Sequence, residues 1–165
     1  MCGIMGFNGE SQASSILIEG LRRLEYRGYD SSGIAVLSGD VVVIKEKGRI
    51  ENLQKTVDEI NPQGTIGIGH TRWATHGIPD KTNAHPHKSM NGIVTLVHNG
   101  IIENYMEIKH DLIQKGYEFR SQTDTEVIAQ LFDSFFDGDA INTMIKTAEK
   151  LKGSYAVAML VKDYE

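Results

Sequence analysis

The segment GIAVLSGDVVVI, residues 33–44, decides the fold class of this chain. Two apolar runs rich in β-branched residues flank the turn sequence Ser38-Gly39-Asp40, a pattern typical of a β-hairpin. The strands of a hairpin are antiparallel, whereas parallel strands need a long crossover connection. The segment therefore predicts an antiparallel sheet rather than a doubly wound parallel one.

Outside the hairpin, apolar periodicity predicts strands in pairs and helices in blocks. Strands are predicted at 3–8, 65–69, 93–98 and 155–161, and helices at 13–26, 50–60, 103–115, 125–136 and 140–151. This order favours an α+β layered fold with antiparallel sheets. The polar stretch between the strands at 65–69 and 93–98 is longer than most connections, so we expect chemistry there.

Composition excludes several classes of protein. The 165 residues include 40% apolar and 24% charged residues, as in a soluble single domain, and no apolar run is long enough to cross a bilayer. The net charge of -5, without a long Lys/Arg block, argues against a nucleic-acid partner. No signal-like segment precedes the single cysteine, Cys2, and no disulfide can form within the chain. We expect a cytoplasmic protein with a small-molecule partner, no membrane partner and no cofactor.

Cys2 becomes the N-terminal residue if Met1 is removed. One residue would then carry a thiol nucleophile and an α-amine able to accept its proton, so no histidine partner is required. The alternative is a small buried apolar residue with no catalytic role.

The sequence His98-Asn99-Gly100 follows an apolar run and has two interpretations. Asn-Gly is a common two-residue hairpin turn. Alternatively, the Asn99 amide and the Gly100 N–H form an oxyanion hole, the pair of donors that an acyl-transfer intermediate needs.

The loop GHTRWATHG, residues 69–77, concentrates groups able to bind a ligand. Arg72 lies among side chains that could pack on a ligand, which suits bidentate capture of a carboxylate. A metal site is the less favoured alternative, because no carboxylate or second cysteine stands at a recognised ligand spacing; its candidate ligands are His70, His76, His85 and His87. We expect no metal.

Residues 121–132, SQTDTEVIAQLF, contain the helix-capping pattern Thr123-x-x-Glu126. Asp124 in the first turn would complement the helix dipole, or it could face a pocket and pair with a ligand ammonium group. The spacing does not choose between these roles. The segment EYRGYDSSG, residues 25–33, is predicted to be a loop, and it lacks the spacing and Lys of a P-loop.

Six ordered motifs together resemble the N-terminal glutaminase domain of the glutamine–fructose-6-phosphate aminotransferases, a family of class II glutamine amidotransferases. They are Cys2-Gly3-Ile4, LRRLEYRGYDSSG, HTRWATHG, NAHPH, VHNGIIENY and SQTDTEVIA. The resemblance covers nearly the whole chain. It implies that Cys2 attacks the side-chain amide of glutamine, releasing ammonia and leaving a thioester that water hydrolyses.

The resemblance also implies roles for matching positions. Cys2 is the nucleophile, and Asn99 and Gly100 form the oxyanion hole. Arg72 holds the glutamine α-carboxylate and Asp124 the α-ammonium. The resemblance further implies that a loop containing Trp73, Thr75 and His76 closes over glutamine. It places Arg27 near the nucleophile.

The implied fold is the four-layer αββα sandwich of N-terminal-nucleophile hydrolases, with residues 1–165 forming a C-terminally truncated amidotransferase domain. The implied partners are L-glutamine and the isomerase domains of the same enzyme, which would be a homo-oligomer at full length. Two hypotheses compete with an active enzyme. In the first, a truncated chain, or one that retains Met1, binds glutamine or a partner without turnover. In the second, the chain is a thiol peptidase, which would have to accept substrates with blocked termini despite Arg72 and Asp124.

Overall fold

The computed structural model describes residues 2–74 and 77–164, which form an α+β fold. Strands and helices alternate along only part of the chain. The order of the elements is close to the order predicted from the sequence. The elements are β1 (Gly3–Asn8), α1 (Ala13–Leu24), η1 (Glu25–Arg27), β2 (Ser31–Ser38), β3 (Asp40–Lys47), α2 (Ile50–Ile60), β4 (Ile66–Arg72), β5 (His87–Lys88), β6 (Val94–Ile102), α3 (Tyr105–Gln114), α4 (Thr125–Phe135), α5 (Ala140–Lys150) and β7 (Gly153–Val161).

The first sheet has the strand order β1-β4-β2-β3, and every neighbouring pair is antiparallel. The predicted hairpin is confirmed, because Ser38 pairs with Asp40 across the β2–β3 turn. Gly39 at the turn has φ +73, a left-handed conformation that glycine adopts without steric cost.

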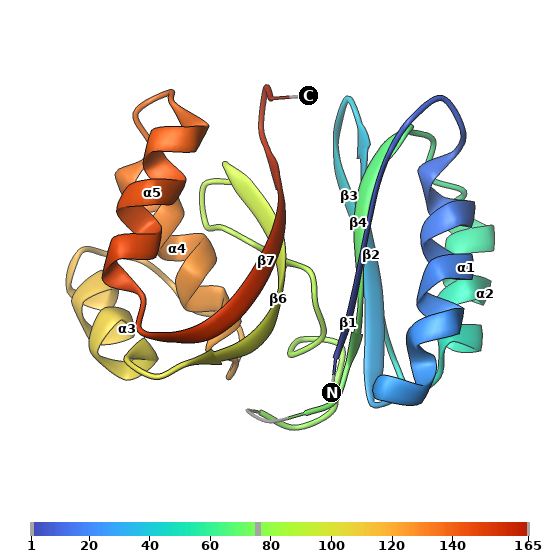
Figure 1. Ribbon diagram of the computed structural model, residues 1–165, viewed down its shortest axis with the longest axis horizontal. Helices are drawn as coiled ribbons and strands as arrows, with labels where there is room; N and C mark the ends of the chain where they lie inside the picture. Colours follow the sequence, from blue (N-terminus) through green and yellow to red (C-terminus); the bar gives the residue numbers. More distant parts are fainter. Residues whose placement is uncertain (1, 75–76, 165) are drawn as a thin grey trace.

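The second sheet has the order β5-β6-β7 and is also antiparallel. Figure 1 shows four layers: α3, α4 and α5 cover one sheet, the two sheets face each other, and α1 and α2 cover the other sheet. The predicted α+β class with antiparallel sheets and αββα layers is thereby confirmed.

Three apolar clusters hold these layers together. Leu17 and Leu21 of α1 pack with Leu53 of α2 on the first sheet, and a second cluster around Phe132 joins the helices α3–α5 to the second sheet. The cluster between the sheets is smaller and consists of Ala35, Ile68, Val97 and Leu160 with partly buried neighbours. Burying one such aliphatic side chain contributes about 1.5–3 kcal/mol, so apolar burial fixes the spacing of the sheets that carry the site.

The interpretation of Asn99-Gly100 as a hairpin turn is wrong. Both residues lie within β6, where Asn99 pairs with Ala156 and Gly100 with Tyr155 of β7. Gly100 has φ +125, so it deforms the strand locally while β6 continues to Ile102. Local turn preference is overridden here by pairing with a strand more than fifty positions away.

The predicted capping box at Thr123 and Glu126 is also wrong. α4 begins at Thr125, and the buried Glu126 carboxylate instead accepts hydrogen bonds from the backbone N–H groups of Arg120 (2.9 Å) and Ser121 (2.6 Å). Glu126 therefore fixes the loop before α4 rather than the helix end.

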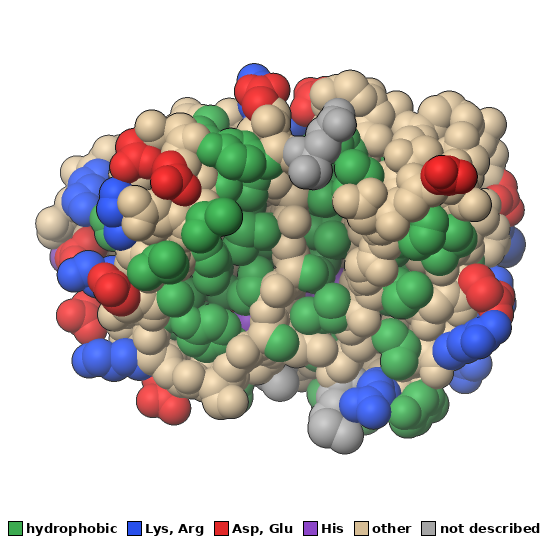
Figure 2. Space-filling model, turned by 45° about the horizontal axis from the view of Figure 1, so that its top comes forward, with side chains coloured by type: hydrophobic (Ala, Val, Ile, Leu, Met, Phe, Trp, Pro, Cys, Tyr) green, Lys and Arg blue, Asp and Glu red, His purple; other side chains and the backbone are tan. Residues whose placement is uncertain are grey.

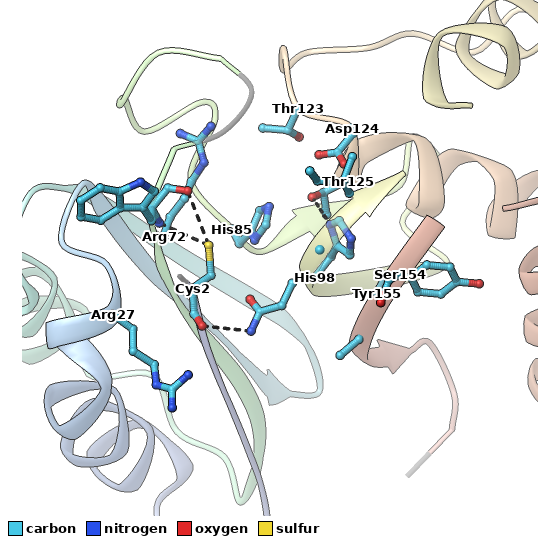
Figure 3. Close-up of a pocket in the computed structure, with 15 residues that line it drawn as sticks. Cys2, Arg27, Arg72, His85, His98, Thr123, Asp124, Thr125, Ser154 and Tyr155 are labelled. Atoms are coloured by element: carbon cyan, nitrogen blue, oxygen red, sulfur yellow. Dashed lines mark hydrogen bonds between the residues drawn. The ribbon is translucent and has the colours of Figure 1, made fainter. Parts of the chain in front are cut away.

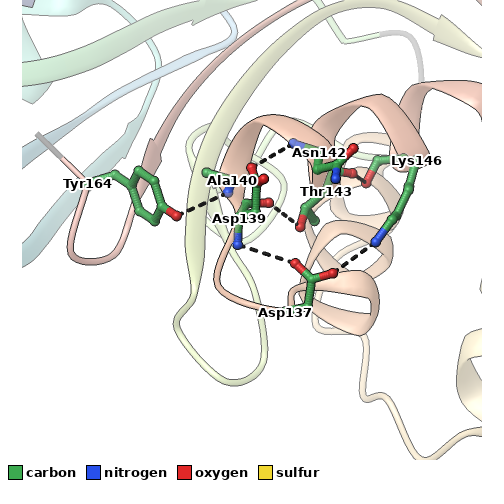
Figure 4. Close-up of polar contacts among 8 residues, drawn as sticks. Asp137, Asp139, Ala140, Asn142, Thr143, Lys146 and Tyr164 are labelled. Carbon is green, nitrogen blue, oxygen red and sulfur yellow. Dashed lines mark hydrogen bonds and ion pairs between the residues drawn. The ribbon is translucent and has the colours of Figure 1, made fainter.

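α5 has a side-chain cap that the sequence analysis did not single out. Asp139 accepts a hydrogen bond from the N–H of Asn142 at 2.9 Å, and Lys146 pairs with Asp137 at 2.9 Å in the preceding turn (Figure 4). Tyr164, after β7, contacts the same loop through Gly138 and Ala140. These contacts attach the end of the described chain to the start of α5.

Within the described residues, β7 is hydrogen-bonded to a neighbouring strand on one side only. Figure 2 shows apolar side chains gathered in the middle of the face turned toward the viewer. None of the helices in residues 2–74 and 77–164 is both long and apolar enough to cross a bilayer.

Candidate active site

A cavity of about 690 Å³ opens where the two sheets and the start of α4 meet. The sequence prediction placed functional residues in five separate segments. All of those that the structure describes line this one cavity: Cys2, Arg27, Arg72, Trp73, Asn99, Gly100 and Asp124. The predicted residues Thr75 and His76 lie outside the described residues.

The Cys2 thiol is held beside the backbone at the end of β4. The N–H of Trp73 points at Cys2 Sγ at 3.3 Å, and the thiol donates to the Trp73 carbonyl oxygen at 3.6 Å (Figure 3). The antiparallel pairing of Gly3 with Thr71 places these two segments side by side. The two contacts with the Trp73 backbone hold the sulfur at the mouth of β4, where it lines the cavity.

Asn99 and Gly100 lie on β6, in the facing sheet. The Asn99 side chain donates from Nδ2 to the Cys2 carbonyl oxygen at 3.1 Å, so the amide is directed toward the thiol-bearing residue (Figure 3). An amide has two N–H groups, and only one of them is needed for this bond. The other remains available to a ligand oxygen in the cavity.

Arg72 is a buried cation at the end of β4. Its guanidinium donates to the carbonyl oxygens of Ile78 at 3.3 Å and Gly77 at 3.2 Å. Burial lowers the pKa of Arg72 from its ordinary value, while the nearby Cys2, Asp30, Asp80 and Asp124 act in the opposite direction. A guanidinium keeps its charge under such shifts, so the cavity has a fixed positive end.

Asp124 is 4% exposed and is the residue directly before α4. Its Oδ2 accepts the backbone N–H of Ile102 at 2.9 Å, which ties the end of β6 to the start of α4. An ionised carboxylate has further acceptor capacity, so Asp124 can also bind a cationic group in the cavity.

Arg27 is positioned within η1, and Trp73 is positioned by the loop between η1 and β2. Arg27 donates from Nε to the hydroxyl of Tyr26 at 3.0 Å, and the Trp73 ring meets the Tyr29 ring edge-on at 5.7 Å. Asp30 accepts the N–H of Ala74 at 2.5 Å. The loop at residues 28–30 therefore holds the segment that follows Arg72.

Four histidines gather at one side of the cavity, and two of them, His85 and His98, line it; the other two are His70 and His87. His85 Nδ1 lies 3.0 Å from His70 Nε2, and His98 Nδ1 lies 2.8 Å from the Thr125 hydroxyl. Burial lowers the pKa of all four, that of His70 to about 3. No group of three or more His, Cys, Asp or Glu side chains in the described part of the chain has an arrangement that could hold a metal ion.

The cavity also contains residues that the sequence analysis did not predict. Ser154, Tyr155 and Ala156 of β7 form part of its wall because β7 pairs with β6 at Asn99 and Gly100. Their sequence is that of an ordinary apolar strand, so only the register of pairing reveals them.

The fold and the cavity together define a class: an antiparallel αββα sandwich with a thiol at the start of the first strand, beside an amide donor and a cation. A family model described as a glutamine amidotransferase domain matches residues 70–165. The chain belongs to this glutamine amidotransferase family.

Similar curated proteins are longer than this chain. A protein named glutamine–fructose-6-phosphate aminotransferase (isomerizing) from Caldanaerobacter subterraneus subsp. tengcongensis is 54% identical over 164 residues, which are 99% of this chain and 27% of that protein. The protein of the same name from Clostridium acetobutylicum is 54% identical over 161 residues, and these cover 97% and 26% of the two chains. The chain thus spans about a quarter of the length of these relatives.

Two solved structures share the fold. A glutamine phosphoribosylpyrophosphate amidotransferase from B. subtilis, complexed with ADP and GMP, superposes with a TM-score of 0.84 at 28% identity and covers 98% of this chain and 35% of that one. An allosteric regulatory enzyme of purine biosynthesis superposes with a TM-score of 0.86 at 28% identity over 98% of this chain and 36% of that one. The fold is accordingly of the N-terminal-nucleophile type.

Proposed function

We propose that this chain hydrolyses the side-chain amide of glutamine with Cys2 as an N-terminal nucleophile. The observation that carries the proposal is the sharing of one cavity by the Cys2 thiol, the Asn99 amide, a cation and an anion. Family membership supports glutamine as the substrate.

The first chemical step forms a thioester. The Cys2 sulfur attacks the amide carbon, and the α-amine of Cys2, free once Met1 is removed, takes the thiol proton. Negative charge develops on the substrate oxygen, which the Asn99 side-chain N–H and the Gly100 backbone N–H would stabilise. The same amine returns the proton to the leaving nitrogen, and ammonia departs.

The second step consumes water. A water molecule attacks the thioester carbon through a second tetrahedral intermediate in the same oxyanion hole, and the carbon–sulfur bond breaks. Glutamate leaves and the thiol is restored. No other reactant is required.

Arg72 and Asp124 would bind the two charged groups on the α-carbon of glutamine. A guanidinium matches a carboxylate in bidentate geometry, and the Asp124 carboxylate matches the ammonium. Arg27 and the loop around Trp73, Thr75 and His76 would complete the enclosure. A substrate with blocked termini would leave both buried charges unpaired, which disfavours peptides.

We further propose that residues 1–165 form part of a type 2 amidotransferase domain in a longer enzyme. The name of the relatives supports use of the ammonia to convert fructose 6-phosphate to glucosamine 6-phosphate. Residues outside this chain would supply the isomerase domains. The chain alone is expected to make glutamate and ammonia and no amino sugar.

The test combines intact mass with product analysis. Protein whose mass shows loss of Met1 is incubated with glutamine, and glutamate and ammonia are quantified with fructose 6-phosphate present or absent. Equal release of both products supports the proposal. Glutamine binding without any release would favour the alternative of a binding module, and amino-sugar formation would contradict the division of labour.

A further inference from the structure

His70 lies at the centre of the contact between the two sheets. It belongs to β4, pairs with Ile4 of β1 and Gly33 of β2, and has an exposed fraction of 0%. Its ring crosses to β6, where Nε2 lies 2.9 Å from Asn99 Oδ1 and 3.0 Å from the His98 carbonyl oxygen. His70 is not among the residues that line the cavity, but its Nε2 contacts three that are: Asn99, His98 and His85, whose Nδ1 lies 3.0 Å away.

The protonation of His70 follows from these partners. A carbonyl oxygen can only accept, so the contact with His98 is a hydrogen bond when His70 Nε2 carries the hydrogen, and His85 Nδ1, 3.0 Å from the same nitrogen, then faces it as an acceptor. Its other nitrogen, Nδ1, has no hydrogen-bond partner among the described residues, which suits an unprotonated nitrogen better than an N–H. Burial lowers the pKa of His70 to about 3, so the ring stays neutral at physiological pH.

The orientation of the Asn99 amide follows from its two partners, His70 and Cys2. The oxygen end accepts from His70 Nε2, and the nitrogen end donates to the Cys2 carbonyl oxygen at 3.1 Å. A flip of the amide by 180° would bring oxygen against the Cys2 carbonyl and N–H against N–H at His70. Both contacts would be lost together.

We propose that His70 is a positioning residue, which locks the Asn99 amide with its N–H groups toward Cys2 and the reacting carbonyl. This inference rests on the proposed function. Without the His70 donor, the amide can rotate and present its oxygen to the developing oxyanion, which would repel it. The loss should therefore fall on the transition state rather than on glutamine binding.

The test compares three substitutions. His70→Gln can place an amide nitrogen near the position of Nε2, His70→Asn has a donor that is too short to reach Asn99, and His70→Leu has none. We expect His70→Asn and His70→Leu to lower kcat by about 10-fold to 100-fold with less than threefold change in KM, because removing an oxyanion donor outright costs about 100-fold to 1000-fold. His70→Gln should recover most of the activity.

Two controls separate positioning from folding. His110→Leu removes an exposed histidine on α3, whose Nε2 lies 2.8 Å from Nε2 of Gln114 and which is outside the cavity lining, and should keep wild-type kcat. Thermal unfolding of each variant shows which samples are folded. If His70→Leu does not fold, His70→Asn is the variant that tests the positioning role.

A double-mutant cycle with Asn99→Ala gives the decisive readout. If His70 acts through Asn99, adding His70→Asn to Asn99→Ala should lower kcat by less than twofold further. Independent, multiplied losses, or a wild-type kcat for folded His70→Asn, would overturn the positioning role. Absence of glutamine hydrolysis by the unsubstituted chain would instead contradict the proposed function, so the two failures are distinguishable.

Discussion

The side chain of Asn99 donates a hydrogen bond to the backbone carbonyl of Cys2 at 3.1 Å, across 97 positions of sequence. Cys2 precedes the edge strand of one sheet and Asn99 lies in the middle strand of the other. The bond therefore joins the segment that carries the proposed nucleophile to the proposed oxyanion donor, and the packing of the sheets determines whether they meet.

Cys2 must be the first residue for the proposed chemistry. Cys2→Ala, or a chain that retains a residue before Cys2, should reduce glutamine hydrolysis to background, because the former lacks the thiol and the latter the free amine. Glutamine binding, measured by calorimetry, should persist in both. Robust turnover by protein whose mass shows retained Met1 would exclude the amine as base.

Arg72 and Asp124 are expected to recognise the two ends of glutamine. Arg72→Ala and Asp124→Asn should each lower kcat/KM by about 30-fold or more, since an unpaired buried charge on the ligand costs about 2–5 kcal/mol. Asp111→Asn, on the exposed face of α3, is the matched control.

A substrate analogue sharpens the assignment of Asp124. Glutamine without its α-ammonium group should be a poor substrate for the unsubstituted chain, and Asp124→Asn should not worsen it. If Asp124→Asn weakened both substrates equally, the loss would reflect the bond from Ile102 N–H to the carboxylate and not recognition of the ammonium.

Gly100 has no room for a side chain. Its φ is +125, and an added Cβ would lie 2.2 Å from the Ser154 carbonyl oxygen, so Gly100→Ala should destabilise the fold by about 2 kcal/mol or more and displace the Gly100 N–H. Gly6→Ala in β1 is the control, because nothing lies within 4 Å of its Cβ. Denaturant unfolding measures the stability of both variants. Equal midpoints would contradict the prediction, because they would show that β7 moves away from the added methyl group without loss of stability.

The buried histidines should make the chain sensitive to acid. Burial lowers the pKa of His70 from 6.5 to about 3, so below pH 6.5 the unfolded chain binds a proton that the folded chain does not. The contribution of His70 to the free energy of unfolding is therefore fully present above pH 6.5. It is lost as the pH falls toward 3, by up to about 1.4 kcal/mol per pH unit.

The pH dependence can be assigned with a variant. His70→Gln removes one titrating group. The slope of unfolding free energy against pH between 4 and 6 should therefore decrease by the contribution of about one bound proton. His85, His87 and His98, whose pKa values burial also lowers, should maintain a remaining slope. An unchanged slope in His70→Gln would show that His70 does not titrate between the two states.

The cap of α5 offers a stability test away from the site. Asp139→Ala should destabilise the fold by about 1 kcal/mol because the N–H of Asn142 loses its acceptor. Asp139→Asn retains a side-chain oxygen and should cost less than half as much. Equal losses in thermal unfolding would indicate that charge, rather than capping, accounts for the contribution of Asp139.

The sequence determined the local elements and the chemistry available to them. The hairpin at 33–44 predicted antiparallel strands because both runs and their turn are adjacent in the chain, and the apolar period predicted each long helix for the same reason. The six motifs likewise identified Cys2, Arg72 and Asn99 as candidate site residues, although the short strand β5 gave no comparable signal.

Only the tertiary structure decided which of the local alternatives holds. Asn99-Gly100 has the composition of a turn, yet it is part of a strand because β7 pairs with it along its whole length. Glu126 has the spacing of a capping residue, yet it bonds to Ser121 because the loop before α4 folds back on it. In the same way, His70 looked like one ligand of a possible metal site and proved to contact Asn99 across the sheets. Local preferences are worth about 1 kcal/mol each, so the pairing of strands and the burial of whole side chains, which depend on residues far apart in sequence, override them.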